Sequence, residues 1–176
     1  LVSLAYKELK KYLGNQSKNI MVIGAGKTIT SLLKFLSKND KHNYTIYNRS
    51  ISKANKINNL LNLNAKVCSI KDIGKTPLNF DIIISATGSK EPILDNKKYD
   101  LINPNNSKSI IVDLAVPKDC HEEMSLNTNI KIINVDQLKE RADENLKLRE
   151  KEINNCLKII NDQIIEYNIF QKERKL

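Results

Sequence analysis

Residues 24 to 28, "GAGKT", carry the clearest chemistry of this 176-residue chain, because two kinds of phosphate site contain parts of this pattern. Gly24 and Gly26 fit the Gly-x-Gly turn that receives a dinucleotide pyrophosphate at the start of a helix. Gly26, Lys27 and Thr28 fit the end of a triphosphate loop, G-x-x-x-x-G-K-[ST]. That loop requires a glycine where Met21 stands, inside a strand-like run, so the dinucleotide interpretation is favoured.

One position departs from the dinucleotide pattern G-x-G-x-x-[GA]. Its third small residue is replaced by Ile29. A glycine there lets the helix pack closely on the strand, so we expect Ile29 to push the helix outward or rotate it. Ile29 should therefore weaken cofactor binding, and Lys27, placed near the pyrophosphate, should partly compensate.

The end of the second strand-like run, "YNRS", predicts which dinucleotide is bound. An acidic residue there would bind the ribose 2′-hydroxyl of NAD, but the sequence has Asn48, Arg49 and Ser50, followed by Lys53. A guanidinium offers a bidentate fork to a phosphate, and the neighbouring hydroxyl and ammonium add to it. The pattern favours NADP over NAD; the alternative is a solvent-facing arginine at a strand end.

Two further strand ends should border the same crevice. The stretch "DIIISATGSKEPIL" (81–94) opens into the small residues Thr87, Gly88 and Ser89, which would let a ring approach the backbone. The stretch "IIVDLAVPKD" (110–119) ends at the same edge. Its Asp113 has two possible roles, capping the turn toward Pro117 or orienting a group near the nicotinamide.

The pattern of elements indicates how these residues are positioned. Apolar, partly β-branched runs occur at 20–23, 44–47, 65–69, 81–84, 109–114 and 130–133, alternating with helical patterns or loops, of which 2–13 and 27–38 are the clearest helices. Continuous apolar runs are typical of strands buried on both faces. We therefore predict an α/β fold, a Rossmann-like, doubly wound, mostly parallel sheet.

A change of pattern at Asp136 predicts one long C-terminal α-helix, to about residue 172. Apolar and long side chains recur there at 4-3-4-3 spacing, without Gly or Pro: Ala142, Leu146, Arg149, Ile153, Cys156, Ile160, Ile164 and Tyr167. Such a stripe should pack on another domain or a partner helix; the alternative is a helix folded back on its own sheet. The predicted division is 1–15, a helix leading from an upstream domain, 16–135, the nucleotide domain, and 136–176, the long helix.

Composition narrows the class of protein. The sequence has no run of about 18 apolar residues, the length needed to cross a bilayer, and no recognisable secretory signal. A soluble cytoplasmic protein is therefore expected. Cys68, Cys120 and Cys156 are odd in number and lie far apart, which argues against a disulfide framework or a zinc site. The net charge of +9 lies wholly in residues 1–135, as scattered lysines with few aromatics. A Lys-, Asn- and Ile-rich composition explains it better than a nucleic-acid-binding face.

Taken in order, "GAG", "NRS", "ISATGSKEPIL", "VDLAVPKD" and "INVDQLKE", running into the long helix, resemble the NADPH-binding domain and the start of the spinal helix of glutamyl-tRNA reductases. The resemblance implies NADPH-dependent reduction of glutamyl-tRNA, through an enzyme thioester, to glutamate 1-semialdehyde, the first step of tetrapyrrole (porphyrin) synthesis. It also implies a homodimer formed through the helix. The catalytic cysteine would lie in an N-terminal domain outside this chain, so no catalytic residue is assigned here, and this chain by itself should be inactive.

The resemblance places the cofactor on four turns. The pyrophosphate would lie on the first turn, Gly24, Ala25, Gly26 and Lys27, and the 2′-phosphate on the second, Asn48, Arg49, Ser50 and Lys53. The nicotinamide would lie between the third turn, Thr87, Gly88 and Ser89, and the fourth, Leu114, Ala115 and Val116. Cys120 and His121 depart from the family pattern, and we interpret Cys120 as a small core residue.

Two other functions remain open. A shikimate-type NADP dehydrogenase domain would have a Lys and Asp pair acting on a hydroxyl, and no long charged helix after the last strand. A non-catalytic module that senses NADP or acts through its helix would be favoured by a poor cofactor site.

Overall fold

The computed structural model describes residues 1–38, 41–75, 77–105 and 107–174, except for the side chains of 168 and 171–173. The chain divides into two compact units, Leu1–Leu138 and Lys139–Leu176. None of the helices among the described residues combines the length and the apolar character that crossing a membrane requires.

The first unit is built on one parallel sheet in the strand order β3-β2-β1-β4-β5-β6. Its strands are β1 (Asn19–Ile23), β2 (Asn43–Asn48), β3 (Lys66–Ser69), β4 (Ile82–Ser85), β5 (Ser109–Asp113) and β6 (Ile130–Asn134). This order reverses between β1 and β4, as in doubly wound nucleotide-binding sheets. The predicted fold class is therefore confirmed, and every predicted strand is present.

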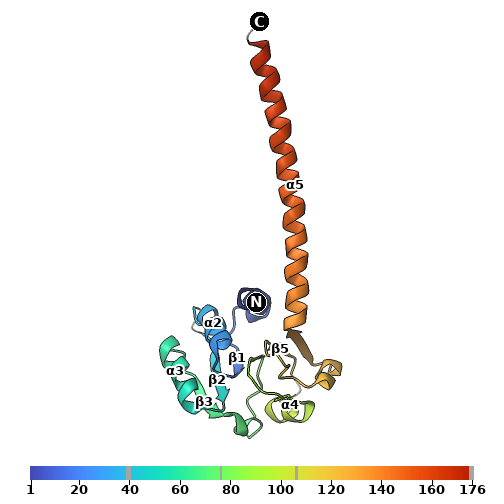
Figure 1. The fold of residues 1–176 in the computed structure, drawn as a ribbon. Coiled ribbons are helices and arrows are strands. Elements are labelled where there is room, and N and C mark those ends of the chain that lie inside the picture. The colour runs from blue at the N-terminus through green and yellow to red at the C-terminus, as the bar shows by residue number, and fades with distance from the viewer. Residues whose placement is uncertain (39–40, 76, 106, 175–176) are drawn as a thin grey trace. The chain divides into compact units, whose positions relative to one another are not determined.

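Helices cover both faces of this sheet (Figure 1). They are α1 (Val2–Leu13), α2 (Lys27–Leu36), α3 (Ile51–Leu61) and α4 (Asn96–Ile102), with short 3-10 turns at Ile70–Asp72 and Glu122–Leu126. Alternate residues of β1 serve different layers: Ile20 and Val22 join the core formed with α1, α2 and α3, whereas Met21 and Ile23 join the core formed with α4. Burial on both faces explains why the strands are continuously apolar.

The register brings the carboxyl ends of five strands into one row. Ile23 pairs with Tyr47 on one side and with Ser85 on the other. Ser85 pairs in turn with Asp113, and Asp113 with Asn134. The turns that follow these residues therefore meet at one edge of the sheet, where ligands bind in open α/β folds.

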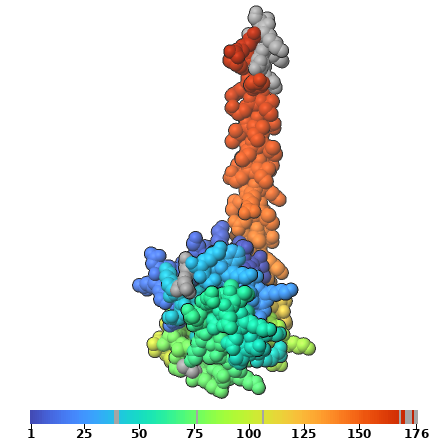
Figure 2. Space-filling model, turned by 90° about the vertical axis from the view of Figure 1, so that its left-hand side faces the viewer, coloured from blue at the N-terminus to red at the C-terminus, as the bar shows by residue number. Residues whose placement is uncertain are grey.

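Helix α5 (Val135–Glu173) forms the second unit apart from its first turn. Asn134 begins it with a reciprocal capping arrangement, in which its Oδ1 accepts from the Gln137 amide (3.0 Å) and Gln137 Oε1 accepts from the Asn134 amide (3.2 Å). The predicted long helix is thus confirmed. Its described side chains from 146 onward are all exposed, whereas Ala142, the first residue of the predicted stripe, is half-buried. Figure 2 shows this helix in orange and red.

Candidate functional site

The β1–α2 turn is shaped by Gly24. Its φ of 111° lies in a region that side chains disfavour, and its amide donates to the carbonyl of Tyr47 (2.8 Å). A Cβ on Gly24 would lie 2.5 Å from the carbonyl oxygen of Ala86 on the neighbouring turn. The first glycine is therefore required by the packing of the sheet itself, whether or not a ligand binds.

Gly26 has a different role. It caps α2 with extended backbone (φ −91°, ψ −179°), it is exposed, and a Cβ placed on it would meet nothing within 4 Å. The first turn of α2 has neither a side-chain cap nor an acidic residue to neutralise its partial positive charge. Contacts within the described chain do not explain this glycine, but an anion lying close to the backbone would.

The two departures from the glycine pattern lie on opposite sides of α2. Ile29 is completely buried in the core cluster that joins α2 to the sheet, together with Leu32 and Leu33. Lys27 is exposed at the first position of the helix. The isoleucine therefore occupies core volume and the lysine stays at the open helix end, as its expected compensating role requires.

The four predicted residues after β2 fall into two groups. Asn48 and Ser50 build the turn: Asn48 Nδ2 donates to the Ser50 carbonyl (2.8 Å), and Ser50 Oγ accepts from the Lys53 amide (3.4 Å) as the cap of α3. Arg49 and the Lys53 side chain are exposed. Within the described part of the chain, the Arg49 guanidinium makes no hydrogen bond or ion pair, so it remains available for an anion.

The turn after β4 is held by Asp119, a residue that the sequence analysis missed. This carboxylate is completely buried and accepts from Ser85 Oγ (2.5 Å), the Thr87 amide (2.9 Å) and Thr87 Oγ1 (2.6 Å). Thr87 Oγ1 in turn accepts from the Ser89 amide (3.1 Å). Through these hydrogen bonds, the buried Asp119 carboxylate holds the predicted turn of Thr87, Gly88 and Ser89 in place. The available signal was the second acidic residue of the stretch "VDLAVPKDC", which follows Asp113 by six positions.

Asp113 closes the turn after β5. Its two carboxylate oxygens accept from the backbone amides of Ala115 (3.0 Å) and Cys120 (2.9 Å). Burial raises the pKa of Asp113, and these amides oppose that rise. Of the two roles left open, the geometry favours the local one, capping the turn.

The predicted nicotinamide-flanking residues after β5 differ in exposure. Leu114 and Ala115 are buried, and the Leu114 amide donates to the Ser85 carbonyl (2.8 Å). Val116 is 78% exposed at this edge of the sheet. It is the residue of this turn that offers an apolar surface to a ligand.

None of the cysteines is arranged as an activated nucleophile. Cys120 is buried in the core beneath α4, and burial, followed by the charge of Asp113, raises the pKa of its thiol. Its neighbour His121 is exposed and lies next to Glu123. Cys68 lies in β3 and Cys156 on α5. The interpretation of Cys120 as a core residue agrees with its burial.

The site as a whole consists of turns after β2, β1, β4 and β5, next to one another at the carboxyl edge. It combines an open helix N-terminus, an exposed guanidinium and a small-residue turn fixed by a buried carboxylate. Such an arrangement can receive an elongated anionic ligand that crosses the sheet at the point where strand order reverses.

Comparison with known proteins identifies relatives of this chain. A family model described as shikimate/quinate 5-dehydrogenase matches residues 4–141. A glutamyl-tRNA reductase of Methanobrevibacter smithii is 32% identical over 99% of this chain and 42% of its own length. That of Methanocaldococcus jannaschii is 30% identical over 92% of this chain and 40% of its own length. The chain therefore spans less than half the length of these relatives.

Solved structures share the fold. The glutamyl-tRNA reductase of Methanopyrus kandleri matches 86% of this chain, and 38% of its own, with a TM-score of 0.72 at 24% identity. The nucleotide-binding domain of the Thermoplasma volcanium enzyme matches 85% of this chain, and 95% of its own, with a TM-score of 0.64 at 23% identity. A shikimate dehydrogenase in complex with NADP+ matches 77% of this chain, and 50% of its own, with a TM-score of 0.56 at 23% identity.

Proposed function

Since the chain belongs to the shikimate/quinate 5-dehydrogenase family and its relatives over 92–99% of its length are glutamyl-tRNA reductases, we propose that it is the NADPH-binding part of a glutamyl-tRNA reductase. The proposed reaction is the reduction of glutamate, released from its tRNA as an enzyme thioester, to glutamate 1-semialdehyde. A thioester accepts hydride far more readily than a carboxylate does.

The observation that carries this proposal is the combination of Gly26 and Arg49 at one edge of the sheet. Gly26 leaves space at an uncapped helix N-terminus, which suits a pyrophosphate. Arg49 is exposed one strand away, at the end of β2, where the adenosine ribose lies in this fold, and its guanidinium suits a 2′-phosphate. Both groups are explained by NADP and neither is needed by the fold.

Each remaining residue would contribute to binding in a definite way. Bound NADPH would supply the hydride. Ala25 and Lys27 would border the pyrophosphate, and Lys53 would add charge beside the 2′-phosphate. Thr87 to Ser89 and Leu114 to Val116 would flank the nicotinamide, with Val116 covering the ring and Asp119 keeping the Thr87 turn in place.

The thiol that forms the thioester would have to come from outside these 176 residues. Cys120 has a buried thiol whose pKa is raised, Cys156 lies on α5, and Cys68 is half-buried in β3, where it pairs with Tyr47 of β2. In this proposal the chain binds the NADPH that delivers the hydride, and a cysteine elsewhere forms the covalent thioester.

Replacing Arg49 with alanine is expected to weaken NADPH binding about tenfold or more and to leave NADH binding within about twofold. The reason is that only NADPH carries the phosphate, and charge-assisted hydrogen bonds contribute about 1.5–3 kcal/mol. Calorimetric titration of the wild type and the variant with both cofactors measures this difference. Lys56→Ala on α3 removes an exposed charge elsewhere and is the control. Equal losses for NADPH and NADH would remove the 2′-phosphate assignment.

A shikimate-type dehydrogenase is the competing function, because the matching family model carries that description. That match ends at residue 141, whereas α5 continues to Glu173 and the match with the M. smithii reductase covers 99% of the chain. These two facts favour the reductase. Shikimate-dependent reduction of NADP+ by the chain would reverse the choice. Binding of neither cofactor would favour the non-catalytic alternative.

Helix α5 is proposed to associate with a partner helix, in the simplest case that of a second copy. Its stripe residues Ile153, Ile160 and Ile164 are between 51% and 58% exposed. We expect sedimentation velocity to show association that rises with concentration, and Ile160→Asp to abolish it. Asn155→Asp introduces the same carboxylate about 140° away around the helix and should have little effect. A wild-type chain that stays monomeric at high concentration would contradict this proposal.

A further inference from the structure

Two cavities lie at the amino edge of the sheet, opposite the proposed cofactor site, and lysines line both of them. One, of about 430 Å³, is lined by residues at the starts of β1, β2 and β3, among them Asn19, Lys41 and Lys66. The other, of about 370 Å³, is lined at the starts of β4, β5 and β6, among them by Lys18, Lys108 and Lys131. Neither cavity shares a residue with the four cofactor turns.

Lysines mark the start of nearly every strand along this edge. Lys18 directly precedes β1, Lys66 is the first residue of β3, and Lys108 directly precedes β5. Lys41 lies two residues before β2, and Lys131 is the second residue of β6. Neighbouring strands lie about 4.8 Å apart, so this row crosses roughly 24 Å. A small anion could cover only part of such a row.

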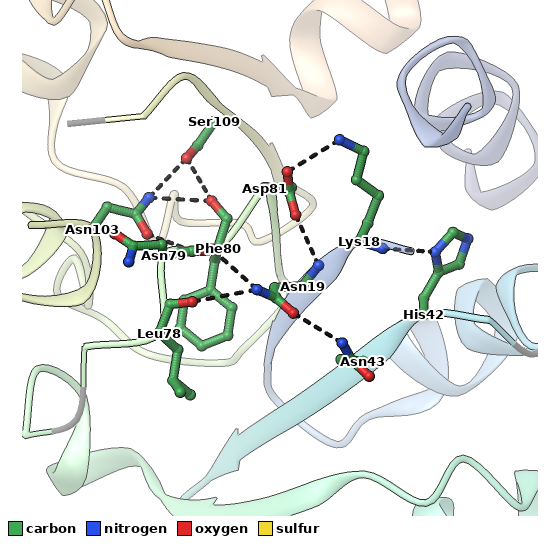
Figure 3. Close-up of polar contacts among 10 residues, drawn as sticks. All are labelled: Lys18, Asn19, His42, Asn43, Leu78, Asn79, Phe80, Asp81, Asn103 and Ser109. Carbon is green, nitrogen blue, oxygen red and sulfur yellow. Dashed lines mark hydrogen bonds and ion pairs between the residues drawn. The ribbon is translucent and has the colours of Figure 1, made fainter. Parts of the chain in front are cut away.

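The single acidic side chain among the described residues lining the two cavities is already neutralised. Asp81, just before β4, accepts from Lys18 Nζ (3.1 Å) and from the Asn19 amide (2.9 Å). Figure 3 shows this carboxylate between the Lys18 and Asn19 nitrogens. The charge of Lys41, Lys66, Lys108 and Lys131 is therefore not cancelled by an acid lining either cavity.

The pKa of His42 responds to the positive charges at this edge. Its Nδ1 accepts from the Lys18 amide (3.3 Å), so that this nitrogen carries no proton. Burial lowers the pKa of His42, and the charges of Lys41 and Lys18 lower it further, whereas Asp81 opposes them. An anion bound nearby would raise this pKa.

Hydrogen bonds link Phe80, which lines the first cavity, to Ser109, which lines the second. Asn103 Nδ2 donates to the Phe80 carbonyl (3.2 Å) and to Ser109 Oγ (2.7 Å), and Ser109 Oγ donates to the same carbonyl (2.7 Å). Asn43 Nδ2 donates to Asn19 Oδ1 (3.1 Å), which links β2 to β1 (Figure 3). Satisfied networks of this kind fix the positions of the groups they contain, so the lysines project from a preformed surface.

We propose that this lysine-lined amino edge, defined by Lys18, Lys41, Lys66, Lys108 and Lys131, binds the phosphodiester backbone of RNA. Phosphates are held by Lys charge and by side-chain amides, both of which line the cavities. A protein partner would instead need apolar anchors. Within the described part of the first unit, none of its large exposed apolar residues (Leu1, Ile51, Leu60, Leu101, Val116 and Leu126) lines either cavity.

The choice of RNA substrate rests on the proposed function, which makes a tRNA the natural ligand. The arrangement leaves the cofactor edge open, because the two sites lie at opposite ends of the strands. RNA bound at the amino edge would therefore leave the cofactor site accessible.

The test is a fluorescence anisotropy titration of a labelled, uncharged glutamate tRNA transcript with the whole chain at several salt concentrations. The double variant Lys66→Ala/Lys108→Ala removes one exposed lysine from each cavity. It should bind the transcript about tenfold more weakly or worse, and the slope of log K against log salt should shrink by about two. The matched variant Lys56→Ala/Lys97→Ala removes two exposed lysines from α3 and α4 and should bind as the wild type does.

The two histidines of the chain give an independent readout, because His42 lies at the amino edge and His121 beyond β5 at the other end. Added transcript should shift the NMR signals of the His42 ring and raise its pKa, and should leave His121 unchanged. Equal weakening by both double variants, unchanged affinity in Lys66→Ala/Lys108→Ala, or a response of His121 alone would overturn the proposal. NADPH titration of the same variants tests the cofactor function separately and should give wild-type affinity.

Discussion

Alanine at Gly24 is expected to lower the free energy of unfolding by about 3 kcal/mol or more, whereas alanine at Gly26 should change it by less than about 1 kcal/mol. At Gly24 the new Cβ would lie 2.5 Å from the Ala86 carbonyl oxygen, on a backbone with φ 111°. At Gly26 the Cβ would meet nothing within 4 Å. We therefore expect substitution of Gly24 to affect folding and substitution of Gly26 to affect cofactor binding.

Urea unfolding followed by the near-ultraviolet circular dichroism of tyrosine measures this difference, because Tyr47 and Tyr99 are buried in the first unit. Gly26→Ala should unfold with the wild type but bind NADPH about tenfold more weakly or worse, since its methyl group occupies the space expected for the pyrophosphate. Wild-type NADPH affinity in Gly26→Ala would refute the placement of the pyrophosphate at this turn. Wild-type stability in Gly24→Ala would refute the close approach to Ala86.

The second large effect is expected at Asp119. Asp119→Ala leaves the buried Ser85 hydroxyl without its acceptor, together with the Thr87 amide and hydroxyl. Each buried polar group that loses its partner destabilises the fold by about 1–3 kcal/mol, so a loss of about 3–5 kcal/mol is expected. Asp119→Asn keeps the shape but replaces one acceptor with a donor, and should fall between the alanine variant and the wild type.

Asp95 provides the matched control for this change. Its carboxylate caps α4 by accepting from the Lys98 amide (2.7 Å), so Asp95→Ala should destabilise by only about 1 kcal/mol. The same urea transition ranks the three variants. NADPH titration of Asp119→Asn, at a temperature where it is folded, should show weaker binding because the Thr87 turn is no longer fixed. Equal stability of Asp119→Ala and Asp95→Ala would contradict the role assigned to Asp119.

Most of the fold could be predicted because each element is specified locally. The six apolar runs are the six strands, with ends within about two residues, and continuous burial on both faces is visible in the sequence as runs without polar alternation. Helix α1 has the bounds predicted for it, because its apolar spacing ends at Gly14. Helices α3 and α4 were not specified, since only short segments of each are buried.

The turns that meet at the carboxyl edge could be predicted, but the separate roles of their residues could not. The order of turns along the chain identified the residues that meet at the carboxyl edge, because parallel strands bring their ends together. It did not distinguish Asn48 and Ser50, whose side chains build the turn, from Arg49, which is left exposed. That distinction depends on hydrogen bonds between neighbouring side chains and backbone, which residue type alone does not reveal.

By itself, the sequence determined the class of fold, the long helix and the position of the glycine turn after β1, because hydrophobic periodicity and glycine spacing are local properties. Only the tertiary structure decided which glycine serves the sheet, and that Asp119 holds a turn more than thirty residues away in the chain. Lysines that look scattered along the chain, from Lys18 to Lys131, also gather at one edge only in the folded sheet. Parallel crossover connections place residues some twenty or more positions apart side by side, a proximity that no local pattern encodes.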